Sequence, residues 1–289
     1  MDNNIYIGRG DLVVTVAKPG TLYDRARFDW TGFIPQATYR GKTFCTSEEG
    51  PLKLPSTGGE GFNNEFKADE ASMGWDDTDR YFLKPGVGLL ERINDRPYSF
   101  FTNYPITQPF PCEMDVYPDT VSFRLAAIPH KGIAYAMDKH IAVVDNALLI
   151  TTTLHNVGDK PLTMSEYNHN FLTMDNQGTH PQVSLTVNPD YEDANNVTGL
   201  VKNHDSITFT DALEKFFMIK CTNPIAYAPM RWEMRDDKAH MRIQEWGDFD
   251  VTDYWVWGGP HVISPEVFGN VSTQPGQKRT WTRIWKFFA

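Results

Sequence analysis

Cysteine is scarce in this chain of 289 residues. The three cysteines, Cys45, Cys112 and Cys221, are widely spaced, odd in number and never arranged as CxxC. A disulfide framework pairs its cysteines, and a structural zinc site needs closely spaced cysteine or histidine ligands. The sequence therefore argues against both arrangements and favours a reducing compartment, so we expect a cytoplasmic protein.

Basic runs and long apolar runs are also missing. Lysine and arginine number 27 against 37 acidic residues, for a formal net charge of −10, and no basic stripe is present that could follow a nucleic-acid backbone. No apolar run is long enough to span a membrane, and residues 1–12 lack the apolar segment of a signal peptide. We therefore expect no nucleic-acid partner and no membrane partner.

Several motifs that carry chemistry in other proteins are absent. The chain has no GxSxG nucleophile motif, and GVG at residues 86–88 lacks the third glycine and the following helix of a nucleotide-binding loop. His169, Asp175 and His180 are near one another in sequence, but their spacing matches no metal-binding motif. We therefore predict no metal site at these residues.

Short alternating segments dominate what is present. Hydrophobic residues make up 40% of the chain and aromatic residues 13%, which suits a sizeable core built from strands. The clearest segment is HIAVVDNALLITTTLHN, in which two strands meet at Asp145 and Asn146 as in a β-hairpin. Helical periodicity is rare, although TDALEKFF (210–217) could form one helical turn. The sequence predicts an all-β single domain over residues 1–289, with two packed antiparallel sheets.

Residues 45–82 differ from the rest of the chain in composition. The stretch SEEGPLKLPSTGGEGFNNEF (47–66) is rich in glycine, serine, proline and glutamate, and it is too long for a simple connection. Long loops on β scaffolds commonly line a binding site. We therefore expect residues 45–82 to form a loop beside the functional site.

One histidine lies in the stretch SEYNHNFLTMDNQG. Alternation along a strand places Tyr167, His169 and Phe171 on one face, and Glu166 and Asn168 on the other. A histidine in such a strand can be an ordinary packed residue or an acid–base catalyst. The pattern alone leaves both interpretations open.

A carboxylate near the C-terminus lies in the context HVISPEVFGN. Glu266 follows a proline between apolar residues, a setting that favours partial burial. Burial would raise the pKa of this carboxyl toward the range of a useful base. The alternative is a loop glutamate that pairs with an arginine.

Three stretches resemble the aldose 1-epimerase, or galactose mutarotase-like, superfamily. LLITTTLHNVGDKPLTMSEYNHNFL is similar to the family's strand, turn and following strand with Asn-His and an aromatic residue. ISPEVFGNVSTQPGQKRTWTRIWKF is similar to its glutamate beside proline, with a Pro-Gly turn before the last strand. RFDWTGFIPQATYRGKTF is similar to its early strands. The resemblance runs across most of the chain.

The resemblance implies a large antiparallel β-sandwich with a sugar pocket on a concave face. His169 would match the histidine that protonates the ring oxygen of the sugar, and Glu266 the glutamate that deprotonates the anomeric hydroxyl. The ring then opens, the C1–C2 bond rotates and the ring closes on the other face. The substrate would be a small carbohydrate, no metal or organic cofactor is needed, and we expect a monomer or a homodimer.

The sequence departs from the family where an early histidine is common. That region reads FLKPGVGLLERINDRPYSF, where Lys84 or Arg92 takes the histidine's place, and Arg27 is a further candidate for holding sugar hydroxyls. Tyr167 would shape the pocket. Asp205 and Asp211 both stand where the family's sugar-binding aspartate is expected, and we take Asp211 as the candidate.

Two further functions stay open at this point. The first is a lyase or isomerase that acts on a modified or acidic sugar on the same fold, since fold does not fix reaction. The basic candidates Lys84, Arg92 and Arg27 motivate it. The second is a carbohydrate-binding protein without catalysis, for which exposed tryptophans could supply stacking surfaces. The aromatic candidates are Trp30, Trp75, Trp255 and Trp257.

Overall fold

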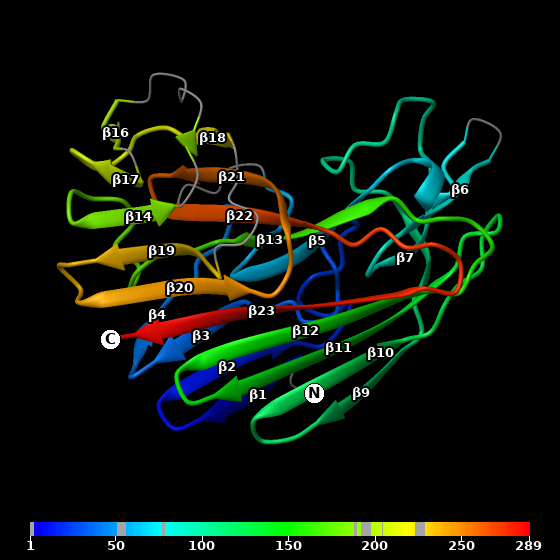
Figure 1. The fold of residues 1–289 in the computed structure, drawn as a ribbon, viewed down its shortest axis with the longest axis horizontal. Helices are drawn as coiled ribbons and strands as arrows, with labels where there is room; N and C mark the ends of the chain where they lie inside the picture. The colour runs from blue at the N-terminus through cyan, green and yellow to red at the C-terminus, as the bar shows by residue number, and fades with distance from the viewer. Residues whose placement is uncertain are drawn as a thin grey trace.

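Antiparallel strands make up nearly all of the regular structure. The computed structural model of the protein describes residues 3–50, 56–76, 79–187, 190–191, 198–203, 205–222 and 229–289. In this part of the chain the only helix is one 3₁₀ turn, η1 (Ala71–Met73). The predicted all-β class with antiparallel pairing is confirmed (Figure 1).

The largest sheet of the described residues has ten strands, and its long strands β23, β12 and β11 run side by side across the molecule (Figure 1). In spatial order its strands are β16 (Leu200–Lys202), β17 (Ser206–Phe209), β14 (Val183–Val187), β19 (Met230–Asp236), β20 (Met241–Gly247), β23 (Lys278–Phe288), β12 (Ala147–Asn156), β11 (Tyr135–Val144), β10 (Thr120–Leu125) and β9 (Cys112–Val116).

A second sheet of six described strands carries the residues that matter most below. In spatial order its strands are β15 (Asp190–Tyr191), β18 (Phe217–Thr222), β21 (Val251–Gly259), β22 (Val262–Asn270), β13 (Met164–Asn170) and β5 (Phe62–Ala68).

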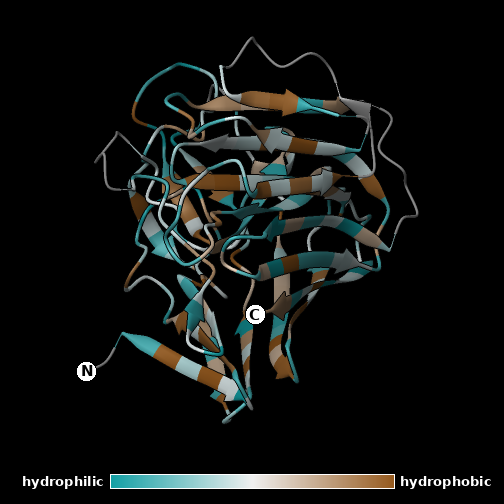
Figure 2. Cartoon of the chain, turned by 90° about the vertical axis from the view of Figure 1, so that its left-hand side faces the viewer, coloured by the Kyte–Doolittle hydropathy of each residue, from teal (hydrophilic) through white to brown (hydrophobic). Residues whose placement is uncertain are grey.

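The inner faces of these two sheets pack against each other. The ring centroid of Phe62 on β5 lies 5.0 Å from that of Trp285 on β23, and the rings of Phe66 and Trp281 are 6.3 Å apart. Apolar and polar residues alternate along the strands, as the banding in Figure 2 shows. Alternation thus supplies each sheet with one apolar face, and the sandwich core forms where these faces meet.

Two smaller sheets flank the sandwich. The N-terminal sheet packs beside β10 and β11, and the other lies near η1 on the opposite side of Figure 1. The N-terminal strands are β1 (Asn4–Arg9), β2 (Leu12–Ala17), β3 (Gln36–Tyr39) and β4 (Lys42–Thr43). The strands of the other small sheet are β6 (Tyr81–Lys84), β7 (Gly88–Glu91) and β8 (Ile106–Pro109).

Strands β5, β13 and β22 are buried along nearly their whole length. One face of each meets the core, and the other is covered by chain segments that pack over the sheet. Phe28, from the segment before β3, packs edge-on against both His169 and Phe171, with ring centroids 6.1 Å apart in each case. Polar residues on this covered face therefore lie in an enclosed environment.

Some local predictions are confirmed and two are wrong. The hairpin is confirmed, because β11 and β12 pair across Asp145, which adopts the positive φ of 53° that such turns require. The prediction of a loop throughout residues 45–82 is wrong, because 62–68 form β5; residues 51–55, 77 and 78 lie outside the described residues. The segment 210–217 forms bends and the start of β18 without a helical turn.

Candidate active site

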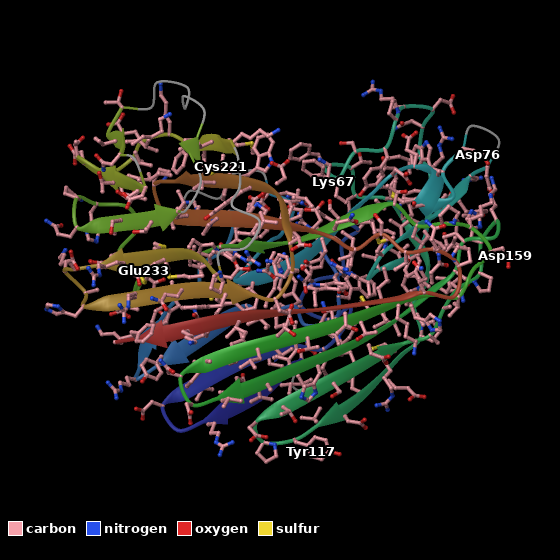
Figure 3. The ribbon with its side chains drawn as sticks, in the orientation of Figure 1. Lys67, Asp76, Tyr117, Asp159, Cys221 and Glu233 are labelled. Carbon is pink, nitrogen blue, oxygen red and sulfur yellow. The ribbon has the colours of Figure 1, made fainter. Side chains whose placement is uncertain are left out.

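A cavity of about 450 Å³ lies over the covered face of the six-stranded sheet. Its walls combine aromatic rings with charged groups, a composition typical of small-molecule sites. Lys67, at its edge, lies between the part of the molecule that carries Cys221 and the part that carries Asp76 (Figure 3). The lining residues are Arg27, Glu48, Glu65, Phe66, Lys67, Ala68, Lys84, Tyr98, Phe100, Phe101, Tyr167, His169, Met218, Trp255, Trp257, Glu266 and Phe268.

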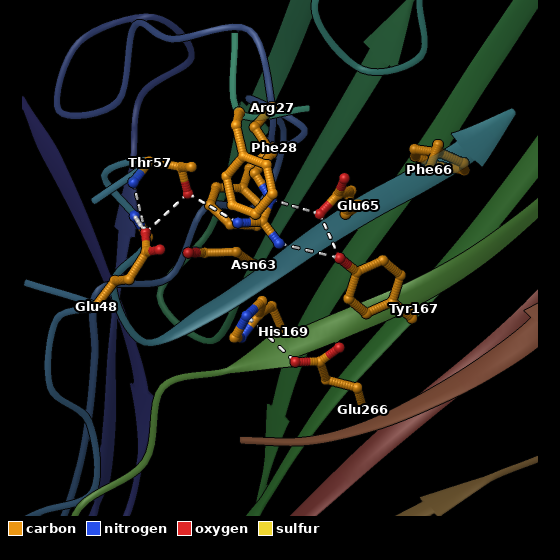
Figure 4. A network of polar contacts seen from close by, with 12 residues as sticks. Arg27, Phe28, Glu48, Thr57, Asn63, Glu65, Phe66, Tyr167, His169 and Glu266 are labelled. Carbon is orange, nitrogen blue, oxygen red and sulfur yellow. Dashed lines mark hydrogen bonds and ion pairs between the residues drawn. The ribbon is translucent and has the colours of Figure 1, made fainter. Parts of the chain in front are cut away.

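His169 and Glu266 meet inside this cavity. Strands β13 and β22 are neighbours, with Tyr167 opposite Phe268, and His169 and Glu266 each lie two positions beyond that pair. Side chains opposite one another on adjacent strands touch, which explains why Nε2 of His169 lies 3.2 Å from Oε1 of Glu266 (Figure 4). Both side chains are buried.

Burial shifts the pKa values of these two groups in opposite directions. It raises the pKa of Glu266 to about 8. It lowers the pKa of His169 well below its usual value, and the positive charge of Arg27 lowers it further. At neutral pH the pair of His169 and Glu266 therefore holds one dissociable proton, and burial favours the microstate in which both groups are uncharged.

Ser264 orients the imidazole of His169. The Ser264 hydroxyl accepts the backbone N–H of Asn170 at 3.0 Å, and its Oγ lies 2.7 Å from Nδ1 of His169 and 3.5 Å from Oε1 of Glu266. Nδ1 is the closer acceptor for the hydroxyl proton, so the neutral imidazole carries its own proton on Nε2. If the ring becomes imidazolium, Nδ1–H donates to Oγ instead, since a hydroxyl can do either.

Aromatic rings fix the plane of the imidazole. Phe171 stacks on His169 with ring centroids 4.0 Å apart and planes 7° apart, and Trp257 meets it edge-on at 5.4 Å. A ring held on two sides and hydrogen-bonded at Nδ1 has little freedom to turn. Its Nε2 is therefore held on the side that carries Glu266.

A second polar group lies beside this pair (Figure 4). Nε of Arg27 donates to Oε2 of Glu65 at 2.7 Å, Nη1 donates to the Thr57 hydroxyl at 3.0 Å, and Nη2 donates to the Tyr167 hydroxyl at 3.2 Å. The Tyr167 hydroxyl in turn donates to Glu65. Each of the three guanidinium nitrogens thus donates one hydrogen bond within the protein, and we interpret Arg27 as a support for the cavity wall.

Lys84 is a different kind of cation. It is 1% exposed, its Nζ donates to the Phe66 carbonyl at 2.8 Å, and Oε1 of Glu65 is 4.0 Å away. Burial lowers the pKa of Lys84 to about 8, because the nearby carboxylate only partly compensates for the loss of water. Among the described residues, the Phe66 carbonyl is the one acceptor at hydrogen-bonding distance from this ammonium, which leaves further N–H groups for a ligand.

The structure brings together five of the seven residues predicted for the site. His169, Glu266, Tyr167, Arg27 and Lys84 all line the cavity.

Arg92 and Asp211 do not belong to this lining, contrary to the prediction. Arg92 directly follows β7, and its guanidinium lies 4.4 Å from the ring centroid of Trp75 and donates to the Asp76 carbonyl. Asp211 is exposed, and its carboxylate accepts the neighbouring N–H of Ala212. Asp205, the other aspartate considered, is exposed as well.

The sequence analysis missed Glu65 and Ser264. Glu65 lay in a stretch interpreted as a loop, and only a strand alternation of Asn63, Glu65 and Lys67 against Phe62 and Phe66 could have indicated it. Ser264 lies two residues before Glu266 on the same strand, so it points to the same face. That spacing was a usable signal.

The described residues contain no group of three or more histidine, cysteine, aspartate or glutamate side chains that could hold a metal ion. Asp175 pairs with Lys42 at 2.6 Å and His180 with Asp236 at 3.0 Å, so the two do not converge with His169. Nor does any helix in the described part of the chain have the length and apolar character to cross a membrane.

The architecture is that of the galactose mutarotase-like proteins. The structure is similar to a galactose mutarotase-like protein from Lactobacillus casei, with a TM-score of 0.60 at 13% identity, over 99% of this chain and all of that one (100%). It is also similar to a galactose mutarotase related enzyme from Lactobacillus acidophilus (TM-score 0.58, 9% identity, 99% and 97% covered). A third match is the aldose epimerase homologue from C. elegans (TM-score 0.56, 12% identity, 99% and 98% covered).

These likenesses show the fold. No protein-family model matches the sequence, and no curated protein matches it.

Proposed function

We propose that this protein is an aldose 1-epimerase-like enzyme, which interconverts the anomers of a sugar by opening and closing its ring. The observation that carries this proposal is the contact of His169 and Glu266, at 3.2 Å, inside one cavity. An imidazole and a carboxyl that jointly hold one proton are an acid and a base side by side. Mutarotation needs both at one hemiacetal.

In the proposed reaction Glu266 removes the proton of the anomeric hydroxyl while Nε2–H of His169 donates to the ring oxygen. The C1–O bond to the ring oxygen breaks, an aldehyde forms at C1, and rotation about C1–C2 precedes closure on the other face. Closure returns both protons to their donors, so the enzyme ends each cycle unchanged. Each proton transfer can supply about 10²–10⁴-fold in rate.

Substrate binding would adjust the protonation of the pair. In the empty cavity burial favours the proton on Glu266, whose pKa is raised to about 8. Sugar hydroxyls that donate to this carboxylate stabilise its charged form and lower its pKa. The proton then moves toward His169, where the reaction requires it.

The supporting surroundings suit a sugar ring. Trp257, Trp255 and Phe268 line the cavity and offer flat apolar surfaces on which C–H faces can stack. The charged and hydroxyl side chains that line the same cavity can hydrogen-bond to sugar hydroxyls. The likeness of the fold to galactose mutarotase-like proteins adds support to the proposal.

The test is the rate of anomer exchange, measured by NMR exchange spectroscopy over a panel of aldoses and sugar acids. We expect the purified protein to accelerate exchange of at least one sugar. Glu266→Gln should lower that rate at least about 100-fold while the circular dichroism spectrum stays unchanged. Failure to accelerate any sugar in the panel, or full activity of Glu266→Gln, would overturn the proposal. Sugar binding that survives in a protein without catalysis would indicate a binding protein instead.

A further inference from the structure

The charges that line the cavity are not balanced at neutral pH. Three basic side chains line it, and the acidic side chains that face them are Glu48, Glu65 and Glu266. Because burial raises the pKa of Glu266 to about 8, this carboxyl is mostly protonated at neutral pH. The cavity lining then carries an excess of one positive charge.

We assign the excess positive charge to Lys84, because the other two basic side chains are paired or solvated. The guanidinium of Arg27 is paired with Glu65 at 2.7 Å and uses all three of its nitrogens within the protein. Lys67 is exposed to solvent. Lys84, in contrast, is 1% exposed and, among the described residues, has one acceptor at hydrogen-bonding distance, the Phe66 carbonyl at 2.8 Å. Buried ammonium groups are normally paired with an anion or fully hydrogen-bonded.

The position of Lys84 relative to the acid–base pair follows from the strand register. Glu65, the carboxylate nearest to Lys84, lies opposite Tyr167, whereas His169 lies opposite Asn63. Two residues along a strand correspond to about 7 Å. Glu65 therefore lies roughly the length of a pyranose ring from the level of His169, on the same face of the sheet, and the ammonium of Lys84 lies 4.0 Å from its carboxylate.

We propose that the substrate is a sugar acid whose carboxylate, at the end of the sugar remote from the anomeric carbon, pairs with the ammonium of Lys84. This inference rests on the proposed function, which places the anomeric carbon at His169 and Glu266. A monoanionic carboxylate matches an excess of one positive charge, whereas a phosphate dianion would leave negative charge uncompensated. The ring centroid of Tyr98, another lining residue, lies 5.6 Å from Nζ of Lys84.

Matched sugars provide the experiment. D-galacturonate differs from D-galactose, and D-glucuronate from D-glucose, in the carboxylate that replaces the terminal CH₂OH. We expect kcat/KM for anomer exchange of at least one uronate to exceed that of its matched aldose at least about tenfold, as a charge-assisted hydrogen bond supports. The corresponding sugar 6-phosphates form a third arm.

Two lysine variants locate the effect. Lys84→Met should reduce the uronate-to-aldose ratio to near one, and Lys84→Arg, which keeps the charge, should retain part of the preference. Lys67→Met removes the same charge from the exposed rim of the cavity and should change the ratio less than about threefold, because a solvated charge is screened. Circular dichroism checks that each variant folds.

The outcomes separate this inference from the proposed function. Equal or faster exchange of neutral aldoses overturns the sugar-acid assignment and leaves the epimerase proposal standing. Preference for a 6-phosphate overturns the carboxylate assignment. If no sugar is accelerated, the proposed function fails, and NMR binding titrations decide this inference: tighter binding of a uronate than of its aldose that depends on Lys84 supports it, and equal binding overturns it.

Discussion

The two faces of strands β5 and β13 carry two polar networks with opposite properties. On the inner face, Lys139 binds Asp29 at 2.6 Å and Asn64 at 2.7 Å, and Asn64 donates to Glu166. Arg283 continues this inner network, with Glu166 at 2.8 Å and Glu245 at 2.5 Å. Each cation there contacts at least one carboxylate.

The polar residues of the cavity face lie on the same or adjacent strands, but their charges are not balanced in the same way. These residues are Glu65, Tyr167, His169 and Glu266. Burial favours the uncharged forms of His169 and Glu266, which contact each other. Within the described part of the chain, the carboxylate nearest to the Lys84 ammonium is that of Glu65, at 4.0 Å. The difference teaches that burial alone does not mark a functional site. In the inner network each cation is paired with a carboxylate of the protein. In the cavity network a dissociable proton and N–H donors remain for a ligand.

The largest expected effect is the loss of stability on breaking the inner network. Arg283→Met removes the cation between Glu166 and Glu245, both of which are buried. We expect the free energy of unfolding to fall by about 3–5 kcal/mol, because two buried carboxylates lose their partner. Urea denaturation followed by tryptophan fluorescence measures this.

The matched change on the cavity face is Glu266→Gln. It replaces a carboxyl that is mostly protonated at neutral pH with a neutral group of the same shape, so its effect on unfolding should be much smaller. Equal destabilisation by Arg283→Met and Glu266→Gln would erase the distinction between the two networks.

Sequence alternation could predict which residues belong to which network on β13. It placed Tyr167 and His169 on one face and Glu166 on the other, and the structure confirms this, since Glu166 binds Arg283 in the core. The burial expected of Glu266 from its apolar neighbours is also found.

The residues that strand β5 contributes to the two networks could not be predicted from the sequence, for a physical reason. Strand β5 carries polar residues on both faces, because Asn64 faces the inner network while Glu65 faces the cavity. Asn64 interrupts the alternation of Phe62 and Phe66 with Asn63, Glu65 and Lys67, so the stretch resembles a loop. Local sequence patterns do not encode how distant segments approach one another. They therefore could not predict that Lys84 donates to Phe66 on β5, or that Arg92 and Asp211 lie outside the cavity lining.

We expect an effect of intermediate size when the anomer-exchange activity is measured as a function of pH. Above about pH 8 Glu266 loses its proton while His169 is already neutral, so the pair no longer contains an acid. The value of kcat/KM for enzymatic anomer exchange, which reports the free enzyme, should therefore fall about tenfold per pH unit above pH 8, and stay level from there down to pH 6.5. NMR exchange, corrected for the uncatalysed rate, measures the profile.

Lys84 has a pKa lowered to a similar value, so a control must separate the two groups. Lys84→Met should keep the decline above pH 8, because the decline is assigned to Glu266. If Lys84→Met abolishes it, the acid–base pair is not the titrating unit.

The smallest expected effect concerns the orientation of His169. Ser264→Ala removes the hydroxyl that lies 2.7 Å from Nδ1. The exchange rate should fall roughly two- to tenfold, the value of one hydrogen bond. ¹⁵N NMR of labelled histidine should show a shift from the Nε2–H tautomer toward a mixture of both tautomers. An unchanged tautomer in Ser264→Ala would show that the aromatic rings alone orient the imidazole.

The central claim is that the cavity face holds one proton between Glu266 and His169 at neutral pH, and it can be tested without knowing the substrate. Glutamate labelled with ¹³C at the side-chain carboxyl reports each titration by NMR. We expect one carboxyl to titrate near pH 8, and its signal to be missing in Glu266→Gln. If the carboxyl of Glu266 titrates near pH 4.5 with the exposed glutamates, the pair holds no shared proton at neutral pH, and the account of the site is contradicted.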